Sequence, residues 1–255
     1  MDLNFKDSGQ GQPLLVLHGL FGMLDNWQSV AGHLDKDHLV VLIDQRNHGR
    51  SPHTDSMSYQ EMATDIRDFM ENRWMYNAAI MGHSMGGKTA MQLALMYPGM
   101  VSRLIVVDIS PVRYPAGHEA IFRALLNADL SHAKSRGAVD AQLQTEIGDP
   151  RIRQFLMKNL RRTKAGSYEW RINLPVIYRD YEKILGPIEC DHPFEGPALF
   201  IRGGKSGYVL PEHESRIRAF FPEAEILTIP NAGHWVHADA PAALIQAVRE
   251  FLGRD

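Results

Sequence analysis

The sequence predicts an α/β protein with a mostly parallel, doubly wound sheet and an inserted helical cap. Two observations support this fold class. Short apolar runs, typical of strands buried on both faces, alternate with helical patterns through most of the chain. Between residues 112 and 195 the alternation stops and the pattern becomes helical. We therefore expect residues 1–111 and 196–255 to form one core and 112–195 to form a cap, a size that one domain can accommodate.

The individual elements follow from apolar runs and helix signals. The predicted strands are Leu3–Lys6, Leu14–Leu17, Leu39–Ile43, the apolar run before Ser84, Leu104–Val107, Ala198–Ile201 and Glu225–Ile229. The predicted helices are Asn26–Leu34, a stretch from Ser58 to Met70, Lys88–Leu95 and Pro241–Leu252, with Ile121–Leu126 and Ile152–Leu160 in the cap. Ser58 and Glu61 form a capping-box pattern at the start of their helix. In such a sheet, ligands bind where the strands end, so the residues after each strand are the candidates for function.

A serine flanked by glycines occupies one of these positions. Gly82-His83-Ser84-Met85-Gly86 lies between an apolar run and a helical pattern. A serine on a strained turn between strand and helix needs small residues two positions before and after it, because a Cβ there would collide with the closing backbone. We therefore predict that Ser84 is a nucleophile. The alternative is a turn rich in glycine and serine without a chemical role.

A serine hydroxyl becomes an effective nucleophile only when a base takes its proton. Among the twelve histidines, His234 lies in the loop after the last predicted strand. Enzymes with such a serine turn carry their histidine there, in the chain order serine, acid, histidine. His234 is therefore the predicted base. His18 and His83 adjoin glycine-containing turns, and we expect them to hold loops by hydrogen bonds.

The acid that orients this histidine has two candidate places. Many such enzymes carry it after the strand that corresponds to Ala198–Ile201, but residues 202–209 contain no carboxylate. The nearest acids lie before that strand or in the predicted helix beyond, at Glu195, Glu212 and Glu214. Asp108 follows a buried strand and keeps the chain order, so we favour it as the acid. The alternative is that Asp108 is a cap or turn residue.

An oxyanion hole requires two backbone N–H groups that point at the developing negative charge. The residue after the nucleophile, Met85, should supply one. The other should come from the glycine-containing turn His18–Gly22, with Leu20 as the first candidate and Phe21 as the second.

Two further stretches have structural explanations that we favour. Asp44 and Arg46 follow a strand, and we expect them to pair and fix their loop. Residues 151–164 contain six basic residues and no acid. We expect a solvated face there, with contact to the phosphates of coenzyme A as the alternative.

Composition limits the classes of partner. A net charge of -3 gives no electrostatic reason to expect a nucleic acid or an anionic membrane. The single cysteine, Cys190, allows neither an intramolecular disulfide nor a cysteine metal cluster, and we expect no metal and no cofactor. The first residues do not have the pattern of a signal peptide, and no apolar run reaches membrane-spanning length. We therefore expect a cytoplasmic monomer or small homo-oligomer that acts on a small molecule.

Several of these motifs together resemble a known family. They are His18–Gly22, Asp25-Asn26, Arg46–Gly49, Gly82–Lys88, Asp108–Val112 and Gly233–His237. They are similar to the YbfF-type esterases and their abhydrolase-domain-11 relatives in the α/β-hydrolase superfamily, and the resemblance covers nearly the whole chain. It implies an esterase or acyl-CoA thioesterase with a small helical cap. It also implies that the acid has moved to the earlier strand, at Asp108, and that Ser206 joins its hydrogen-bond network.

The leading hypothesis is therefore a serine hydrolase that acts on a small-molecule ester or thioester, with acyl-CoA among the candidates. Ser84 would attack the carbonyl, His234 would carry the proton to the leaving group, and Asp108 would hold the imidazolium. The alternatives are a cofactor-free perhydrolase or carbon-carbon bond hydrolase on the same fold, and a non-catalytic binding protein. A dehalogenase is excluded because it would need a carboxylate nucleophile at position 84.

Overall fold

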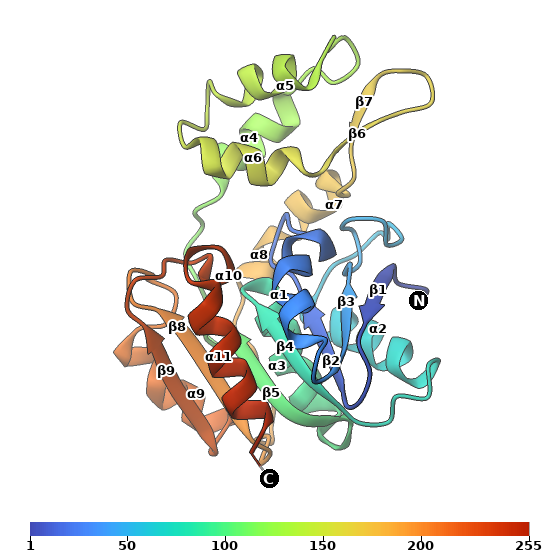
Figure 1. The fold of residues 1–255 in the computed structure, drawn as a ribbon. Coiled ribbons are helices and arrows are strands. Elements are labelled where there is room, and N and C mark those ends of the chain that lie inside the picture. Colours follow the sequence, from blue (N-terminus) through green and yellow to red (C-terminus); the bar gives the residue numbers. More distant parts are fainter. Residues whose placement is uncertain (255) are drawn as a thin grey trace.

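The computed structural model describes residues 1–254, and a seven-stranded sheet forms its centre (Figure 1). The strands are β1 (Phe5–Ser8), β2 (Pro13–Leu17), β3 (Leu39–Ile43), β4 (Ala78–His83), β5 (Val101–Val107), β8 (Ala198–Gly203) and β9 (Ala224–Ile229). They lie in the order β1-β3-β2-β4-β5-β8-β9, and only β1 pairs antiparallel. Their continuous apolar runs are explained by helices on both faces. The predicted fold class is confirmed.

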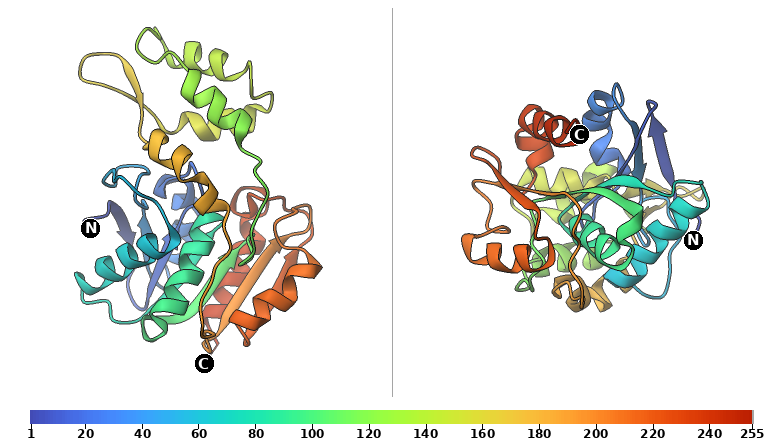
Figure 2. Two further views of the ribbon diagram at one scale, coloured as in Figure 1. Left: turned by 180° about the vertical axis from the view of Figure 1, so that it is seen from behind. Right: turned by 90° about the horizontal axis from the view of Figure 1, so that it is seen from below.

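Two layers of helices cover the sheet (Figures 1 and 2). One face carries α1 (Gln28–Leu34), α10 (Val236–Asp239) and α11 (Pro241–Leu252), and the other carries α2 (Tyr59–Glu71), α3 (Met85–Met96) and α9 (Glu214–Phe220). Short 3₁₀ turns lie at Leu24–Trp27, Pro98–Met100 and Pro211–His213. Helix α2 begins at the predicted N-cap, where the Glu61 N–H donates to Ser58 Oγ. The Glu61 carboxylate accepts the Ser58 hydroxyl at 2.8 Å and not the Ser58 N–H that a full capping box would use.

Several boundaries differ from the sequence-based expectation, two of them near the N-terminus. The first strand begins at Phe5, not Leu3, because its pairing with β3 runs from Phe5 opposite Ile43 to Ser8 opposite Val40. Leu3 is buried in the core without belonging to this ladder. The helix expected from Asn26 begins as a 3₁₀ turn and becomes α-helical only at Gln28.

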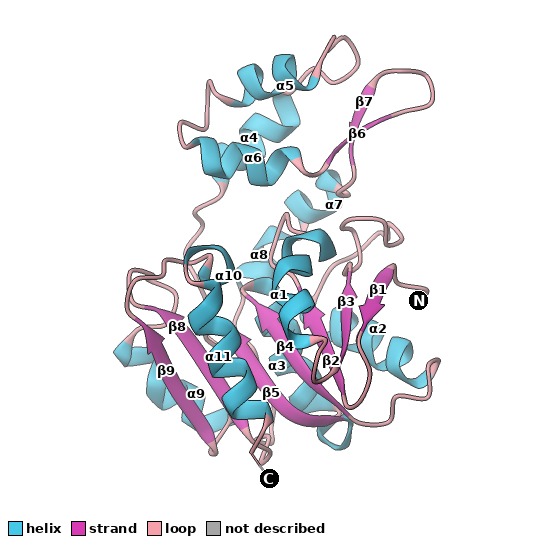
Figure 3. Cartoon of the chain, viewed as in Figure 1, coloured by secondary structure: helices cyan, strands magenta, loops and turns pink. Residues whose placement is uncertain are grey.

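Most of the segment 112–195 lies above the carboxyl ends of the strands and is not purely helical (Figure 3). Its last residues run back along the core, where the Phe194 N–H donates to the Phe220 carbonyl at 2.8 Å. Its helices are α4 (Glu119–Asn127), α5 (Arg136–Leu143), α6 (Pro150–Met157), α7 (Leu174–Arg179) and α8 (Tyr181–Leu185). A hairpin of β6 (Leu160–Arg162) and β7 (Tyr168–Trp170) interrupts them. The helix expected up to Leu160 therefore ends at Met157, since Leu160 already pairs with Trp170. We keep the name cap for this segment.

The two connectors between core and cap run beside each other. The Tyr114 N–H donates to the Leu185 carbonyl at 3.0 Å, and the Ile188 N–H donates to the Pro111 carbonyl at 3.2 Å. The chain therefore leaves the core after β5 and returns to it beside the same point. Within residues 1–254, no helix combines the length and the apolar character that a membrane span requires.

Candidate active site

Ser84 lies on a strained turn between β4 and α3. Its backbone has φ 52° and ψ -120°, a left-handed conformation that costs about 1–3 kcal/mol in a non-glycine residue. The neighbouring glycines are sterically required. A Cβ at Gly82 would lie 2.1 Å from the Gly86 carbonyl oxygen, and one at Gly86 would lie 2.4 Å from the Leu17 carbonyl oxygen. The local sequence therefore folds so that a serine is presented where the central strand ends.

Asp108 and His234 are in direct contact at the same edge of the sheet. Asp108 follows β5, is fully buried and also has a positive φ of 54°. Its Oδ2 accepts a hydrogen bond from His234 Nδ1 at 2.8 Å and another from Ser206 Oγ, and its Oδ1 accepts the Gly203 N–H at 2.8 Å. Because Nδ1 donates to the carboxylate, Nε2 is the nitrogen of neutral His234 that can accept a proton.

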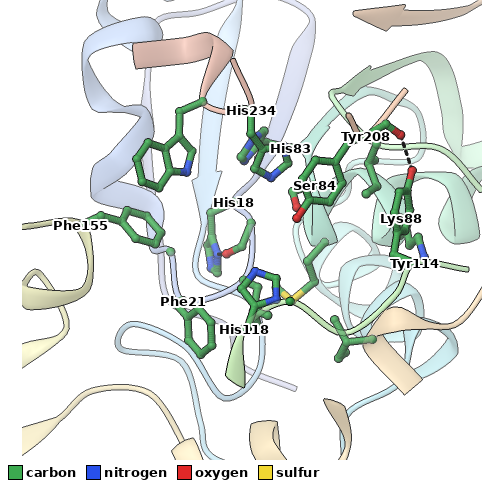
Figure 4. A pocket seen from close by; sticks show the side chains of 18 of the residues that line it. His18, Phe21, His83, Ser84, Lys88, Tyr114, His118, Phe155, Tyr208 and His234 are labelled. Atoms are coloured by element: carbon green, nitrogen blue, oxygen red, sulfur yellow. Dashed lines mark hydrogen bonds between the residues drawn. The ribbon is translucent and has the colours of Figure 1, made fainter. Parts of the chain in front are cut away.

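Aromatic and imidazole rings fix the orientation of His234 (Figure 4). Tyr208 stacks on it with ring centroids 4.0 Å apart and an angle of 21° between the planes. His83 donates from Nε2 to the His234 carbonyl at 2.8 Å, as expected of a residue that holds a loop. Ser84, His83 and His234 line the same cavity. The structure thus brings the predicted serine, acid and histidine to one place.

The other histidines near His234 stay neutral at pH 7. Burial, and then the charge of His234, holds the pKa of His83 well below its ordinary value. The same two causes lower the pKa of His237 to about 4. A positive charge that develops on His234 therefore faces the Asp108 carboxylate and does not face a second imidazolium.

Two backbone N–H groups near Ser84 remain available for an oxyanion. Among the described residues, the N–H groups of Leu20 and Met85 have no acceptor, and both residues line the cavity. The Phe21 N–H, in contrast, donates to His48 Nε2 at 3.2 Å. Burial, and then the charge of His18, lowers the pKa of His48 to about 3, so this ring keeps its acceptor nitrogen. The geometry therefore favours Leu20 and argues against Phe21 as the second donor.

The cavity has a volume of about 270 Å³ and lies between the core and the cap. The cap lines it mainly with apolar side chains, among them Ile121, Ile152 and Phe155. Phe155 of α6 also packs against Trp235, the residue after His234, with ring centroids 5.4 Å apart. An apolar cavity above a polar reaction centre suits a substrate with a hydrophobic portion next to its reacting bond.

Part of the basic stretch 151–164 is paired with acids within the cap. Arg153 is buried, and its Nε lies 3.1 Å from Asp140. Arg161 pairs with Glu169 across the hairpin at 2.6 Å. The acids that are missing from the stretch itself come from neighbouring elements. These pairs explain part of its positive charge without a phosphate ligand.

The loop after β3 differs from the expectation that Asp44 and Arg46 pair with each other. Asp44 instead accepts the backbone N–H groups of Leu24 and Arg50, each at 2.8 Å. Arg46 turns to α2, where its Nε lies 2.6 Å from Asp65 Oδ2. Asp44 therefore holds the backbone at Leu24 and Arg50, and Arg46 holds the loop against α2.

Sequence reasoning missed two polar residues that join core and cap. Lys88 is buried in the first turns of α3, and its Nζ donates to the carbonyls of Val112 and Gly186, one in each connector. Asn159, after α6, donates from Nδ2 to the Phe21 carbonyl at 2.7 Å. Lysine is rarely buried unless it is paired. A lysine within the mostly apolar helix after Ser84 could therefore have indicated a buried polar contact. Nothing local marks Asn159.

Known proteins resemble this chain in sequence and in fold. A family profile described as "alpha/beta hydrolase fold" matches residues 12–131. The Mus musculus protein named "sn-1-specific diacylglycerol lipase ABHD11" is 41% identical over 99% of this chain and 85% of its own length. The chain belongs to the α/β-hydrolase family. The esterase YbfF of Escherichia coli (strain K12) is 38% identical, over 99% of both chains. A solved structure described as "Marine microorganism esterase" is 43% identical, with a TM-score of 0.96 over 98% of this chain and 99% of its own.

These relatives confirm the resemblance to YbfF and abhydrolase-domain-11 proteins. This α/β-hydrolase is an enzyme of the esterase and lipase kind. Within residues 1–254, no group of three or more His, Cys, Asp or Glu side chains is arranged to hold a metal ion.

Proposed function

We propose that this α/β-hydrolase cleaves carboxylic esters through an acyl-enzyme on Ser84. His234 takes the proton of Ser84 Oγ as the hydroxyl attacks the ester carbonyl, and then gives that proton to the leaving alcohol. Asp108 keeps Nδ1 of His234 protonated and balances the imidazolium charge. The N–H groups of Leu20 and Met85 bind the oxyanion. Water, activated by His234, then releases the acid and restores Ser84.

The observation that carries this proposal is the buried contact between Asp108 and His234 next to the Ser84 turn. A carboxylate that is fully buried and accepts three donors is a fixed anchor for the histidine ring. Ser206 Oγ supplies one of these donors, which supports its proposed place in the network. The stacked ring of Tyr208 holds the imidazole from one side. The base is thus preorganised before substrate arrives.

The direct test is a comparison of Ser84→Ala with the parent protein. We expect the parent to hydrolyse p-nitrophenyl butyrate and to react covalently with a fluorophosphonate probe, with the label on Ser84. The variant should lose both activities because it has no nucleophile. Hydrolysis by Ser84→Ala at the parent rate would disprove the proposal.

Thioesters are the second candidate substrate, because the same acyl-enzyme forms from an acyl-CoA. The pairing of Arg153 and Arg161 with acids does not favour a carrier site on the cap, so we place oxygen esters first. Parallel kinetics on p-nitrophenyl esters and acyl-CoAs of matched acyl length would decide between them. Product analysis with and without peroxide would identify a perhydrolase.

The name of one relative and the lining of the cavity suggest that the substrate has a hydrophobic part. The mouse relative is named as a diacylglycerol lipase, and the cavity of this chain is lined by apolar side chains from the cap. We propose that the acyl chain or the alcohol occupies this apolar part. A ladder of acyl lengths from C2 to C12 would locate the optimum.

A further inference from the structure

The cap places one imidazole in the cavity that has no part in the proposed reaction. Of the polar side chains that the cap contributes to the cavity, Tyr114 donates from Oη to the Tyr208 carbonyl and Tyr181 Oη lies 2.5 Å from His118 Nδ1. The Nε2 of His118 has no hydrogen-bond partner among residues 1–254, and it is not an enclosed atom. This nitrogen therefore has no protein partner, on a residue that lines the cavity.

The His118 ring is held in place from two sides. It precedes α4 as the N-cap residue, packs edge-to-face on Phe21 with ring centroids 5.9 Å apart, and meets Tyr181 at 5.6 Å. Figure 4 shows it across the cavity from His234, next to Phe21. A fixed ring loses little side-chain entropy when it binds a ligand, which is the property of a recognition group.

The hydrogen bonds of Tyr181 favour one position for the ring hydrogen of His118. The Gly117 N–H donates to Tyr181 Oη at 3.3 Å, so this oxygen accepts there. In the described residues, the only acceptor for the Tyr181 hydroxyl hydrogen is His118 Nδ1. In the arrangement that satisfies this hydroxyl within the protein, Nδ1 accepts and the ring hydrogen lies on Nε2. Burial, and then the charge of His234, lowers the pKa of His118, which keeps the ring neutral at pH 7.

We propose that His118 is a specificity-determining residue whose Nε2–H donates a hydrogen bond to an uncharged oxygen of the substrate. This oxygen is an ether, a hydroxyl or a second ester carbonyl, away from the bond that is cleaved. The inference rests on the ester hydrolysis proposed above and names the substrate class for that site. An all-carbon chain in the same place would leave the N–H without a partner, which disfavours such a substrate.

The charges around the cavity favour an uncharged ligand over an anion. Lys88 is the lysine that lines the cavity, and its ammonium is engaged by the backbone carbonyls of Val112 and Gly186. No arginine in the described residues lines the cavity. A carboxylate or phosphate would therefore enter without a free cation to balance it.

The experiment compares esters that differ only by an oxygen in place of a methylene group. For the alcohol side, the pair is pentyl butyrate and 2-ethoxyethyl butyrate. For the acyl side, it is p-nitrophenyl hexanoate and p-nitrophenyl 3-ethoxypropanoate. The measured quantity is the ratio of kcat/KM for the oxygen-containing ester to that for its all-carbon match, in the parent protein and in His118→Phe.

We expect this ratio to fall about tenfold in His118→Phe on the side of the substrate that reaches His118, since one neutral hydrogen bond contributes about a factor of ten. Phe keeps the edge-to-face contact with Phe21 and removes the donor. Tyr181→Phe should lower the ratio less, because it frees the ring to place its hydrogen on either nitrogen. It also provides the test if His118→Phe does not fold.

The outcomes separate this inference from the proposed function. If the parent reacts with the fluorophosphonate probe and hydrolyses the esters, but both variants keep the parent ratio on both sides, the role of His118 is disproved and the esterase proposal stands. An equal loss on both members of each pair would also disprove it, because that result indicates only a structural role. If the parent neither reacts with the probe nor hydrolyses the esters, the proposed function itself fails.

Discussion

The core and the cap contribute to the cavity in different ways. The core supplies the groups proposed to react, and it holds two of them on strained backbone. Ser84 and Asp108 both have positive φ values, and each follows a strand of the sheet. The cap supplies apolar surface and a few polar contacts that reach the core from above, at Asn159 and at the connectors bound by Lys88.

This difference shows how an enzyme can separate catalysis from substrate recognition. Strain at a reacting residue persists only where the surroundings determine its conformation, and the packed sheet provides that rigidity. Recognition of the non-reacting part of a substrate needs shape and a few directed polar groups, which an inserted segment can provide. We therefore expect core substitutions to affect the rate of every substrate and cap substitutions to affect selectivity or stability.

The largest expected effect tests the core. Asp108→Asn should lower kcat about 10³- to 10⁴-fold, because the amide favours the wrong tautomer of His234. Ser206→Ala, which removes one of the donors to Asp108, should lower it less than about tenfold. Stopped-flow and steady-state kinetics on p-nitrophenyl butyrate measure both. Near-parent turnover by Asp108→Asn would show that the acid lies elsewhere.

A smaller effect tests the contact between the cap and the oxyanion loop. Asn159→Leu removes the hydrogen bond to the Phe21 carbonyl, next to the proposed donor Leu20. We expect kcat to fall about tenfold for all esters, since a displaced donor binds the oxyanion less well. Gln154→Ala, an exposed position on α6, is the matched control and should retain the parent kcat. Equal kcat values for the two variants would mean that the cap does not position this loop.

Lys88, which binds both connectors of the cap, should make the free energy of unfolding depend on pH. Burial, and then the charge of Arg113, lowers the pKa of Lys88 from 10.5 to about 7. Between pH 7 and pH 10.5 the unfolded chain keeps a proton that the folded chain has lost, so the contribution of Lys88 to stability rises with pH in this range.

Lys88→Met removes this titration, together with the donor to both connectors. At pH 7 we expect a loss of about 1–3 kcal/mol in the free energy of unfolding, because buried carbonyls lose their partner. The gap between parent and variant should widen from pH 7 to pH 9, measured by urea denaturation. Lys36→Met, at an exposed lysine, should show no such trend. A gap that is constant with pH would mean that Lys88 is not a titrating group of the folded protein.

The smallest expected effect tests the basic stretch of the cap. The double substitution Arg161→Ala and Arg162→Ala removes two exposed cations of the hairpin, of which Arg161 pairs with Glu169. We expect kcat/KM for acyl-CoAs and for p-nitrophenyl esters to stay within about twofold of the parent values. A selective loss on acyl-CoAs would instead make the hairpin a carrier-binding surface.

Sequence reasoning worked best where function depends on neighbouring residues. The turn at Ser84 is marked by glycines two positions away, and Gly82 is required by the turn itself, whereas Gly86 is required by the Leu17 carbonyl of β2. The inner strands are buried on both faces, so they appear as continuous apolar runs. Asp108 and His234 could be placed because each follows such a run, although the roles of all three residues remain proposals.

Contacts between distant segments could not be read in this way. Lys88 and Gly186 are 98 residues apart, and His118 and Tyr181 are 63 residues apart. The hydrogen-bond partner of such a side chain depends on how the cap packs against the core. The residues next to it in the sequence do not specify this packing. The same reason explains Arg46, whose partners on α2 were determined by packing and not by its neighbour Asp44.

The paired connectors have a consequence for how such an enzyme can diverge. Tyr114 and Leu185 are hydrogen-bonded neighbours, so the 70 residues between them form a closed excursion whose ends lie about 5 Å apart. A different insertion whose ends are similarly spaced could replace the cap between Tyr114 and Leu185 without a change in any strand of the sheet. Selectivity could then be exchanged as a module, both by evolution and in chimaeras, while the residues on either side of the cap keep the chemistry.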